Sequence, residues 1–128
     1  MTRKWHFNVH DKTDGILRHL TDGVSARVFG GEQMTVSVVE LEPGASSPLH
    51  SHPQEQWGFM VEGDAVRILG NAEVSMKKGD FWHTPGDVPH GMVAGPNGAI
   101  VIDVFAPPRK EYLEAGSGFG SGSGGDRE

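Results

Sequence analysis

The sequence of 128 residues predicts an all-β domain, a double-stranded β-helix of the jelly-roll type. Short runs rich in apolar and β-branched residues recur along the chain, and Gly, Pro, Asn and Asp separate them. Few stretches have the spacing of an amphipathic helix. Many short antiparallel strands joined by tight turns form a sandwich or a barrel, and the jelly roll leaves few sheet edges exposed.

The runs predict eight or more strands. We expect them at residues 24–29, 34–42, 56–61, 65–69, 73–76, 81–84, 91–94 and 99–105, with a further candidate at 5–9. Gly70-Asn71 and Gly95-Pro96-Asn97-Gly98 have the composition of hairpin turns. Only residues 14–20 and 109–114 are candidates for short helices.

Three regions follow from this pattern. Residues 1–23 form an N-terminal arm that is partly strand, residues 24–115 form the barrel, and residues 116–128 form a tail. The tail is rich in Gly and Ser, a composition typical of flexible linkers, so we expect it to be disordered.

Composition excludes several classes of site and partner. The chain has no cysteine, so disulfides, thiolate metal ligands and cysteine nucleophiles are ruled out. A net charge of −6 argues against nucleic acid or an anionic membrane as a partner. The sequence has no apolar run of the roughly 20 residues that span a bilayer, and no signal-peptide pattern. We expect a cytoplasmic protein.

Four polar residues are candidate metal ligands. His50 and His52 are separated by one residue, so both point to the same side of an extended chain, roughly 6.5 Å apart. Such a pair alone is more often a pair of exposed polar residues. Gln56 begins the next apolar run, and His90 follows a Pro-rich turn that can orient one side chain inward.

These residues stand in two motifs that resemble those of the cupin superfamily, and the strand pattern extends the similarity over about residues 24–106. The first is Gly44-x5-His50-x-His52-x3-Gln56-x6-Gly63, with Gln56 where the family usually has glutamate. The second is Gly79-x5-Pro85-x-Asp87-x2-His90, with Asp87 in place of the usual glycine and Ala94 in place of the usual asparagine. The resemblance implies a cupin barrel whose metal ligands are His50, His52, Gln56 and His90.

Three neutral imidazoles and a neutral amide would leave the charge of one divalent ion uncancelled, which favours anionic ligands. The donor set suits zinc, nickel, iron, manganese or cobalt and does not select among them. Because the imidazoles must be deprotonated, we expect metal affinity to weaken as the pH falls through the ordinary histidine range.

A second group of residues narrows the resemblance. Asp103 lies in an apolar run on the same face as Val101 and Phe105, and a carboxylate there is costly to bury without a partner or a purpose. Arg109 follows Pro107-Pro108. Together with the histidine motif, these residues make the sequence resemble the pectin-degradation cupins, which open 4,5-unsaturated uronates to linear keto acids. The positions that match are Asp103, Phe105 and Arg109. The resemblance implies that Asp103 is the general acid and base, that Arg109 binds the uronate carboxylate, and that Phe105 packs on the sugar. From the residues alone, Asp103 could equally be a strand-end residue that bonds a backbone amide or pairs with Arg109, and Arg109 could be a surface residue.

Aromatic and acidic neighbours have competing interpretations. Trp82 is a candidate substrate contact, although a place in the core or an interface is the commoner one. His83 is expected to be structural, and Glu55 to be a weaker ligand candidate than Gln56. The remaining histidines, His6, His10 and His19, lie outside the motifs and receive no role.

Two other functions remain open at this stage: a metal-dependent dioxygenase with iron or nickel, and a small-molecule-binding domain without turnover. We expect a small anionic carbohydrate-like substrate. If Gln56 points inward, then Trp57 and Phe59 point outward and need cover, so we also expect a homodimer.

Overall fold

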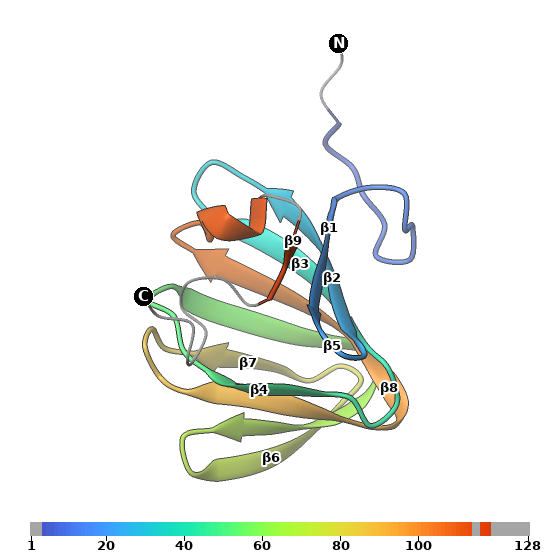
Figure 1. Ribbon diagram of the computed structural model, residues 1–128, viewed down its shortest axis with the longest axis vertical. Coiled ribbons are helices and arrows are strands. Elements are labelled where there is room, and N and C mark those ends of the chain that lie inside the picture. The colour runs from blue at the N-terminus through green and yellow to red at the C-terminus, as the bar shows by residue number, and fades with distance from the viewer. Residues whose placement is uncertain (1–3, 114–115, 119–128) are drawn as a thin grey trace.

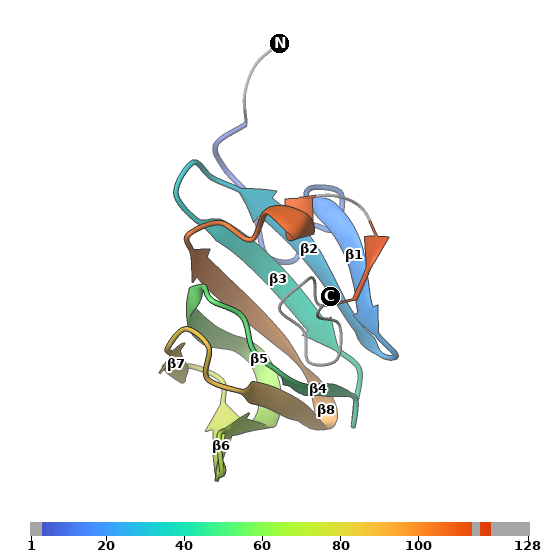
Figure 2. The ribbon, with the colours of Figure 1, turned by 60° about the vertical axis from the view of Figure 1, so that its left-hand side comes forward.

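The computed structural model describes residues 4–113 and 116–118. They form nine strands and one 3₁₀ turn (Figures 1 and 2). The elements are β1 Ile16–Thr21, β2 Val24–Gly30, β3 Thr35–Leu41, β4 Ser46–His50, β5 Glu55–Leu69, β6 Ala72–Lys77, β7 Phe81–Thr84, β8 His90–Ala106, η1 Lys110–Leu113 and β9 Gly116–Ser117. Every strand pair is antiparallel except β1 with β9. The predicted all-β jelly roll is confirmed.

Two long strands organise the barrel because each takes part in two layers. The second half of β8 and the first half of β5 pair with each other, and they are flanked by β3 and β7. The first half of β8 and the second half of β5 pair in the other layer, where β4 and β6 flank them. Both strands pass from one layer to the other where their pairing register shifts, at residues 60–65 of β5 and 94–99 of β8.

The predicted hairpin at residues 95–98 is wrong. These residues lie inside β8, where Ala94 pairs with Ala65 and Ala99 pairs with Gly63. Four residues therefore stand opposite one, which makes an enlarged bulge and bends the strand without reversing it. For the same reason Glu62-Gly63 does not end a strand, and the two predicted runs at 56–61 and 65–69 are one strand, β5.

Other boundaries also differ from the prediction. Residues 14–20 are not helical, because residues 16–21 form β1 and pair with β2. Residues 5–9 form no strand, and η1 replaces the predicted helix at 109–114. Gly116–Ser117 pair with β1 and the amide of Gly118 donates to the carbonyl of His19, so the predicted tail begins in the sheet; residues 119–128 lie outside the described residues.

β4 was not predicted, because it is polar and contains Pro48. Proline cannot donate a ladder hydrogen bond and is therefore confined to edge strands, and β4 pairs only with β8. Among the described residues, no helix is long and apolar enough to cross a membrane.

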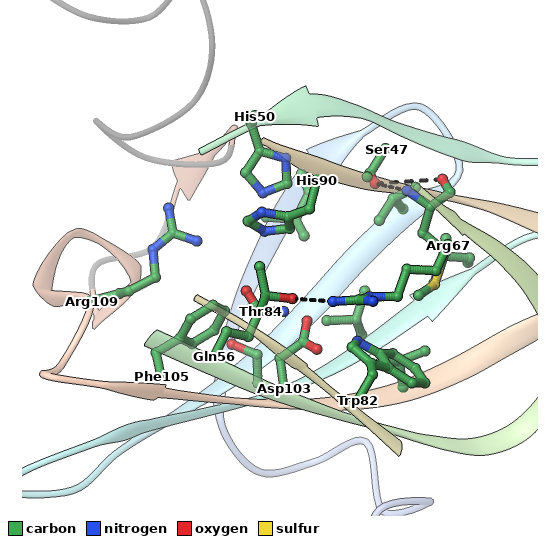
Figure 3. A pocket seen from close by; sticks show the side chains of 18 of the residues that line it. Ser47, His50, Gln56, Arg67, Trp82, Thr84, His90, Asp103, Phe105 and Arg109 are labelled. Atoms are coloured by element: carbon green, nitrogen blue, oxygen red, sulfur yellow. Dashed lines mark hydrogen bonds between the residues drawn. The ribbon is translucent and has the colours of Figure 1, made fainter. Parts of the chain in front are cut away.

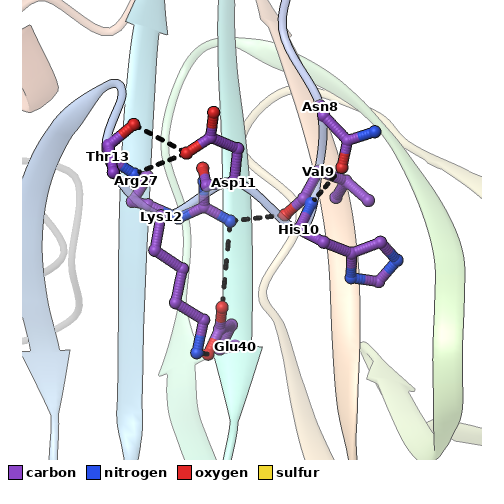
Figure 4. Close-up of polar contacts among 8 residues, drawn as sticks. All are labelled: Asn8, Val9, His10, Asp11, Lys12, Thr13, Arg27 and Glu40. Atoms are coloured by element: carbon purple, nitrogen blue, oxygen red, sulfur yellow. Dashed lines mark hydrogen bonds and ion pairs between the residues drawn. The ribbon is translucent and has the colours of Figure 1, made fainter.

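The N-terminal arm is held against the outside of β2 by one buried arginine (Figure 4). Arg27 donates from Nη2 to the carbonyl of Val9 at 2.6 Å and from Nη1 to the carbonyl of Asp11. Glu40 lies 3.8 Å from Arg27 and 3.3 Å from Lys12, so it joins the arm to the sheet. The ring of Phe7 also packs on Phe29 of β2, with centroids 4.9 Å apart, so backbone acceptors and an aromatic contact together fix the arm.

Replacing Arg27 by Lys should loosen the arm and leave the barrel intact. Lysine cannot reproduce the two guanidinium contacts, and each hydrogen bond from a charged donor stabilises by about 1.5–3 kcal/mol. Amide hydrogen exchange should become faster in residues 8–13 and stay unchanged in β5 and β8. Equal acceleration in all three segments would show that Arg27 supports the barrel itself.

Candidate metal centre

Three buried histidines meet between the two layers of the barrel. His50 ends β4 and His90 begins β8, and the two are direct cross-strand partners. His52 follows in the loop after β4. One ring nitrogen from each lies within 4.8 Å of the others, and the His50 and His90 ring centroids are 4.5 Å apart. Segments 40 residues apart in the chain therefore form one cluster.

The turn before β8 brings His90 to His52. The amide of Asp87 donates to the carbonyl of His52 at 2.8 Å, and a Cβ on Gly86 would stand 2.4 Å from the carbonyl oxygen of Pro53. Backbone therefore packs directly on backbone at Gly86. Asp87 has φ 67°, the left-handed conformation that glycine favours and that aspartate tolerates. This accounts for the Asp at a position where the resembled motif has glycine.

Backbone carbonyls orient all three rings. The Nδ1 atoms of His50, His52 and His90 lie 2.9, 3.1 and 2.8 Å from the carbonyls of Pro48, Gln54 and Val88. A carbonyl only accepts, so each Nδ1 carries the proton and each Nε2 keeps its lone pair. Backbone partners of this kind fix the tautomer of metal-binding histidines.

The free lone pairs fit a cation. Nε2 of His52 lies 3.0 Å from Oε1 of Gln56, so two lone pairs face the same point. Nε2 of His90 is buried and has no hydrogen-bond partner among the described residues. At metal–nitrogen bonds of about 2.1 Å two ligands stand at most about 4.2 Å apart, so an ion would draw the rings inward by a few tenths of an ångström. The three histidines can hold a divalent metal, and Gln56 is placed to be a fourth ligand.

Burial keeps the histidines neutral. Loss of hydration lowers the pKa of His50 to about 4 and that of His52 to about 3, and it also lowers the pKa of His90. The pH range in which protons compete with a metal therefore lies below the ordinary histidine range. We therefore expect the loss of metal affinity at a lower pH than the ordinary histidine range suggested by the sequence.

A cavity of about 60 Å³ opens beside the histidines (Figure 3). The predicted substrate residues Trp82, Asp103, Phe105 and Arg109 all line it. The inward face of β8 is the one that alternation predicted, because Val101, Asp103 and Phe105 share it. Trp82 packs on Gly58, where a Cβ would stand 2.4 Å from the indole Nε1. The indole therefore forms part of the cavity wall.

Asp103 lies under the cluster, near Gln56 (Figure 3). It is partly accessible, and its side chain lines the cavity. Burial raises the pKa of Asp103 to about 7, and its hydrogen bond with Gln56 and the positive charges of Arg109 and Arg67 oppose this rise only in part. The positive charge of Arg109 therefore acts on Asp103 across the cavity, and the pairing of these two residues stays an alternative.

Arg109 is buried rather than on the surface. Its Cζ lies 5.0 Å from the ring centroid of Phe105 and 4.0 Å from that of Tyr112, and its amide donates to Thr35 Oγ1 at 3.0 Å. The guanidinium thus stacks on two aromatic rings, an arrangement that lysine does not reproduce. The ring of Phe105 also meets the edge of His52 at 5.3 Å, so the arginine lies one ring away from the metal cluster.

The lining residues that sequence reasoning missed include Ser37, Arg67, Thr84 and Tyr112, which have polar side chains. For Ser37 the sequence held a usable signal. Ser37 and Val39 are two residues apart on β3, so they share a face, and the apolar Val39 indicates that this face points inward. Arg67 and Tyr112 gave no such signal, since their positions depend on which strands they meet.

Several candidates lie outside the cavity. His83 contacts Glu55 on the outer surface, with Nε2 and Oε2 2.6 Å apart, so neither residue is a ligand. Trp57 and Phe59 are 43% and 39% exposed, and with Phe81 they form a contiguous aromatic patch. The outward direction of these rings is confirmed, and the homodimer stays a prediction.

The comparisons with known proteins agree with this architecture. Residues 37–105 match the cupin domain. The chain belongs to the cupin family. Among solved structures, an RmlC-like cupin from Shewanella frigidimarina is similar with a TM-score of 0.74 at 24% identity, over 88% of this chain and 100% of that one. KdgF from Halomonas sp. is similar with a TM-score of 0.71 at 25% identity, over 76% of this chain and 92% of that one.

The curated relatives are enzymes. Oxalate decarboxylase OxdC of Bacillus subtilis is 35% identical over 52% of this cupin, which spans only 19% of OxdC. Dimethylsulfoniopropionate lyase DddW of Ruegeria pomeroyi is 28% identical over 76% of the chain and 62% of DddW. The pectin degradation protein KdgF of Dickeya dadantii is 24% identical over 73% of the chain and 87% of KdgF. Of these three, KdgF is the one whose length this cupin nearly spans.

Metal affinity should stay nearly constant from pH 8 to pH 5 and fall steeply near pH 4. Protons compete only once the buried imidazoles titrate, and burial moves that titration to lower pH. Equilibrium dialysis against Zn²⁺ followed by metal analysis at each pH measures this. A tenfold loss of affinity between pH 7 and pH 6 would contradict it.

Replacing Asp103 by Asn should stabilise the metal-free protein at pH 8 and not at pH 4. A carboxyl whose folded pKa is raised loses stability as the pH rises from its unfolded value of 3.8 to about 7, because the folded state must then ionise it. The loss is up to about 4 kcal/mol, and Asn avoids it. Urea unfolding gives the free energy of unfolding of both proteins at pH 4 and pH 8. The histidines titrate alike in both proteins, so their contribution cancels in the difference between variant and wild type. If that difference were the same at both pH values, burial would not disfavour ionisation of Asp103.

Proposed function

We propose that this cupin is a non-redox enzyme that opens 4,5-unsaturated uronates to linear keto acids, using a divalent metal. The observation that carries the proposal is the set at one cavity: three neutral histidines, Gln56, the carboxyl of Asp103 and the buried guanidinium of Arg109. The similarity to KdgF over nearly the whole of that protein supports the choice of substrate.

The reaction is an isomerisation and needs no oxidant. The ring carbon–oxygen bond of the hemiacetal breaks and its electron pair goes to the ring oxygen, while the hydroxyl on that carbon loses its proton and becomes an aldehyde carbonyl. The ring oxygen is then an enolate, which becomes a ketone when the proton is delivered to the other carbon of the former double bond. One group must therefore accept a proton and return it. A carboxyl with a pKa near neutrality does both efficiently, and Asp103 is the carboxyl that lines the cavity.

Arg109 would bind the uronate carboxylate. Its guanidinium is held against Phe105 and Tyr112, so little rotational freedom is lost on binding. Phe105 and Trp82 give apolar walls for the face of the sugar ring. A bound divalent metal would supply Lewis acidity toward the oxygens of the substrate.

Turnover of an unsaturated mono-uronate should be metal-dependent and should require Asp103. The assay follows the loss of the double-bond absorbance, with oxygen uptake recorded in parallel. Asp103→Asn should lower kcat by about 10²–10⁴-fold with unchanged metal content, because proton transfer is lost and the ligands remain. Arg109→Lys should mainly raise KM. Arg27→Lys, on β2 under the N-terminal arm and outside the cavity lining, is the control and should match the wild type. Oxygen uptake without loss of the double bond would replace the proposal by an oxygenase.

A further inference from the structure

A second buried arginine faces the cavity from the side opposite Arg109 (Figure 3). Arg67 lies on β5 and is 9% exposed, and its Nη2 donates to the carbonyl of His83 at 2.7 Å and to Thr84 Oγ1 at 2.8 Å. Both acceptors belong to β7, so the guanidinium is fixed across the barrel. The proposed reaction gives this arginine no role.

The remaining donors of Arg67 are unused. Nε and Nη1 donate to no described residue, and no described carboxylate lies within 4.0 Å of the guanidinium. Arg27, which is equally buried, has Glu40 at 3.8 Å. Asp103 acts on Arg67 electrostatically but does not come within 4.0 Å of it, so donors of the buried guanidinium stay unpaired. Burying unpaired donors is costly, which points to a ligand that supplies the missing acceptor.

Two further observations concern the same cavity. The charged residues that line it are two arginines, Arg67 and Arg109, and one carboxyl, Asp103, so the lining has an excess of positive charge. Ser37 is fully buried, lines the cavity and stands opposite Asp103 in the sheet, yet its Oγ has no hydrogen-bond partner in the described part of the chain. The cavity thus offers spare donors away from Arg109.

We propose that Arg67, held by Thr84 and assisted by Ser37, binds an acceptor oxygen, carbonyl or carboxylate, at the end of the substrate remote from the carboxylate bound by Arg109. The ligand is then a short chain with oxygen-bearing groups at both ends and the histidine cluster between them. For the assignment of the two ends this inference rests on the proposed function. Ring opening forms an aldehyde at the end of the chain remote from the carboxylate. In the linear keto acid, this aldehyde oxygen is the group that would accept from Arg67.

Binding of linear carboxylates to the metal-loaded protein tests the subsite without turnover. Calorimetry compares the dicarboxylates malonate, succinate and glutarate with the monocarboxylates propionate, butyrate and valerate. At least one dicarboxylate should bind about 10- to 100-fold more tightly than the monocarboxylate of equal length, as expected for a hydrogen bond to a charged donor. Arg67→Met should abolish this selectivity, and Arg27→Met, which also removes a buried guanidinium, should retain it.

Other outcomes overturn the inference. Equal affinity of the wild type for both series would do so even if Arg67→Met failed to fold. So would a folded Arg67→Met protein that keeps the selectivity, because the metal would then account for it. Arg67→Lys offers a second folded variant; a lysine cannot bond Thr84, the His83 carbonyl and a ligand together, so its selectivity should fall.

The kinetic arm separates this inference from the proposed function. If the wild type turns over the unsaturated uronate, Arg67→Met should raise KM about tenfold or more, and an unchanged KM would overturn the subsite. If the wild type shows no turnover but keeps dicarboxylate selectivity that depends on Arg67, the uronate assignment fails and the two-ended subsite stands.

Discussion

The constraint on which this structure depends is the convergence of neutral imidazoles in a space without bulk water. Each ring gives its Nδ1 proton to a backbone carbonyl and turns its Nε2 lone pair toward the others. Burial then holds the rings unprotonated at pH values where free histidine is largely charged. A backbone contact between the His52 loop and the turn at Gly86-Asp87 maintains this arrangement. The barrel is thus built around a point of electron-rich atoms, which a cation satisfies.

The polar groups that line the cavity oppose folding to different degrees. Asp103 is held where ionisation is unfavourable, and Arg67 and Arg109 are buried beside the same cavity. Their placement is costly, and aromatic stacking on Phe105 and Tyr112 offsets the cost for Arg109 alone. Such unbalanced groups around one cavity are typical of sites built for ligand binding and proton transfer. The apolar remainder of the core carries the stability that these groups reduce.

The relatives share this scaffold and differ in chemistry, as their names show: a decarboxylase, a lyase and a pectin degradation protein. A fold that brings metal ligands from both layers to one point leaves the other cavity positions free to select the substrate. In this chain those positions carry two arginines, one carboxyl and two aromatic walls. Charge and shape at these positions, more than the ligand set, should therefore distinguish this cupin from its relatives.

Sequence by itself determined the fold class and the inward face of the strand that carries Asp103 and Phe105, and the resemblance to the cupin motifs implied the histidine cluster. A period of two along a strand places Asp103 and Phe105 on one face whatever their partners are. Tertiary structure decided the rest. The chain passes continuously through β5 and β8 because each half finds a partner strand in a different layer, and local turn composition at residues 95–98 carries no record of that pairing. Arg67 enters the cavity because β7 presents the His83 carbonyl and Thr84 to it, and Tyr112 covers Arg109 because η1 folds back along β1 and β2. Contacts between residues so distant in the chain depend on the closed barrel, and a linear pattern does not encode them.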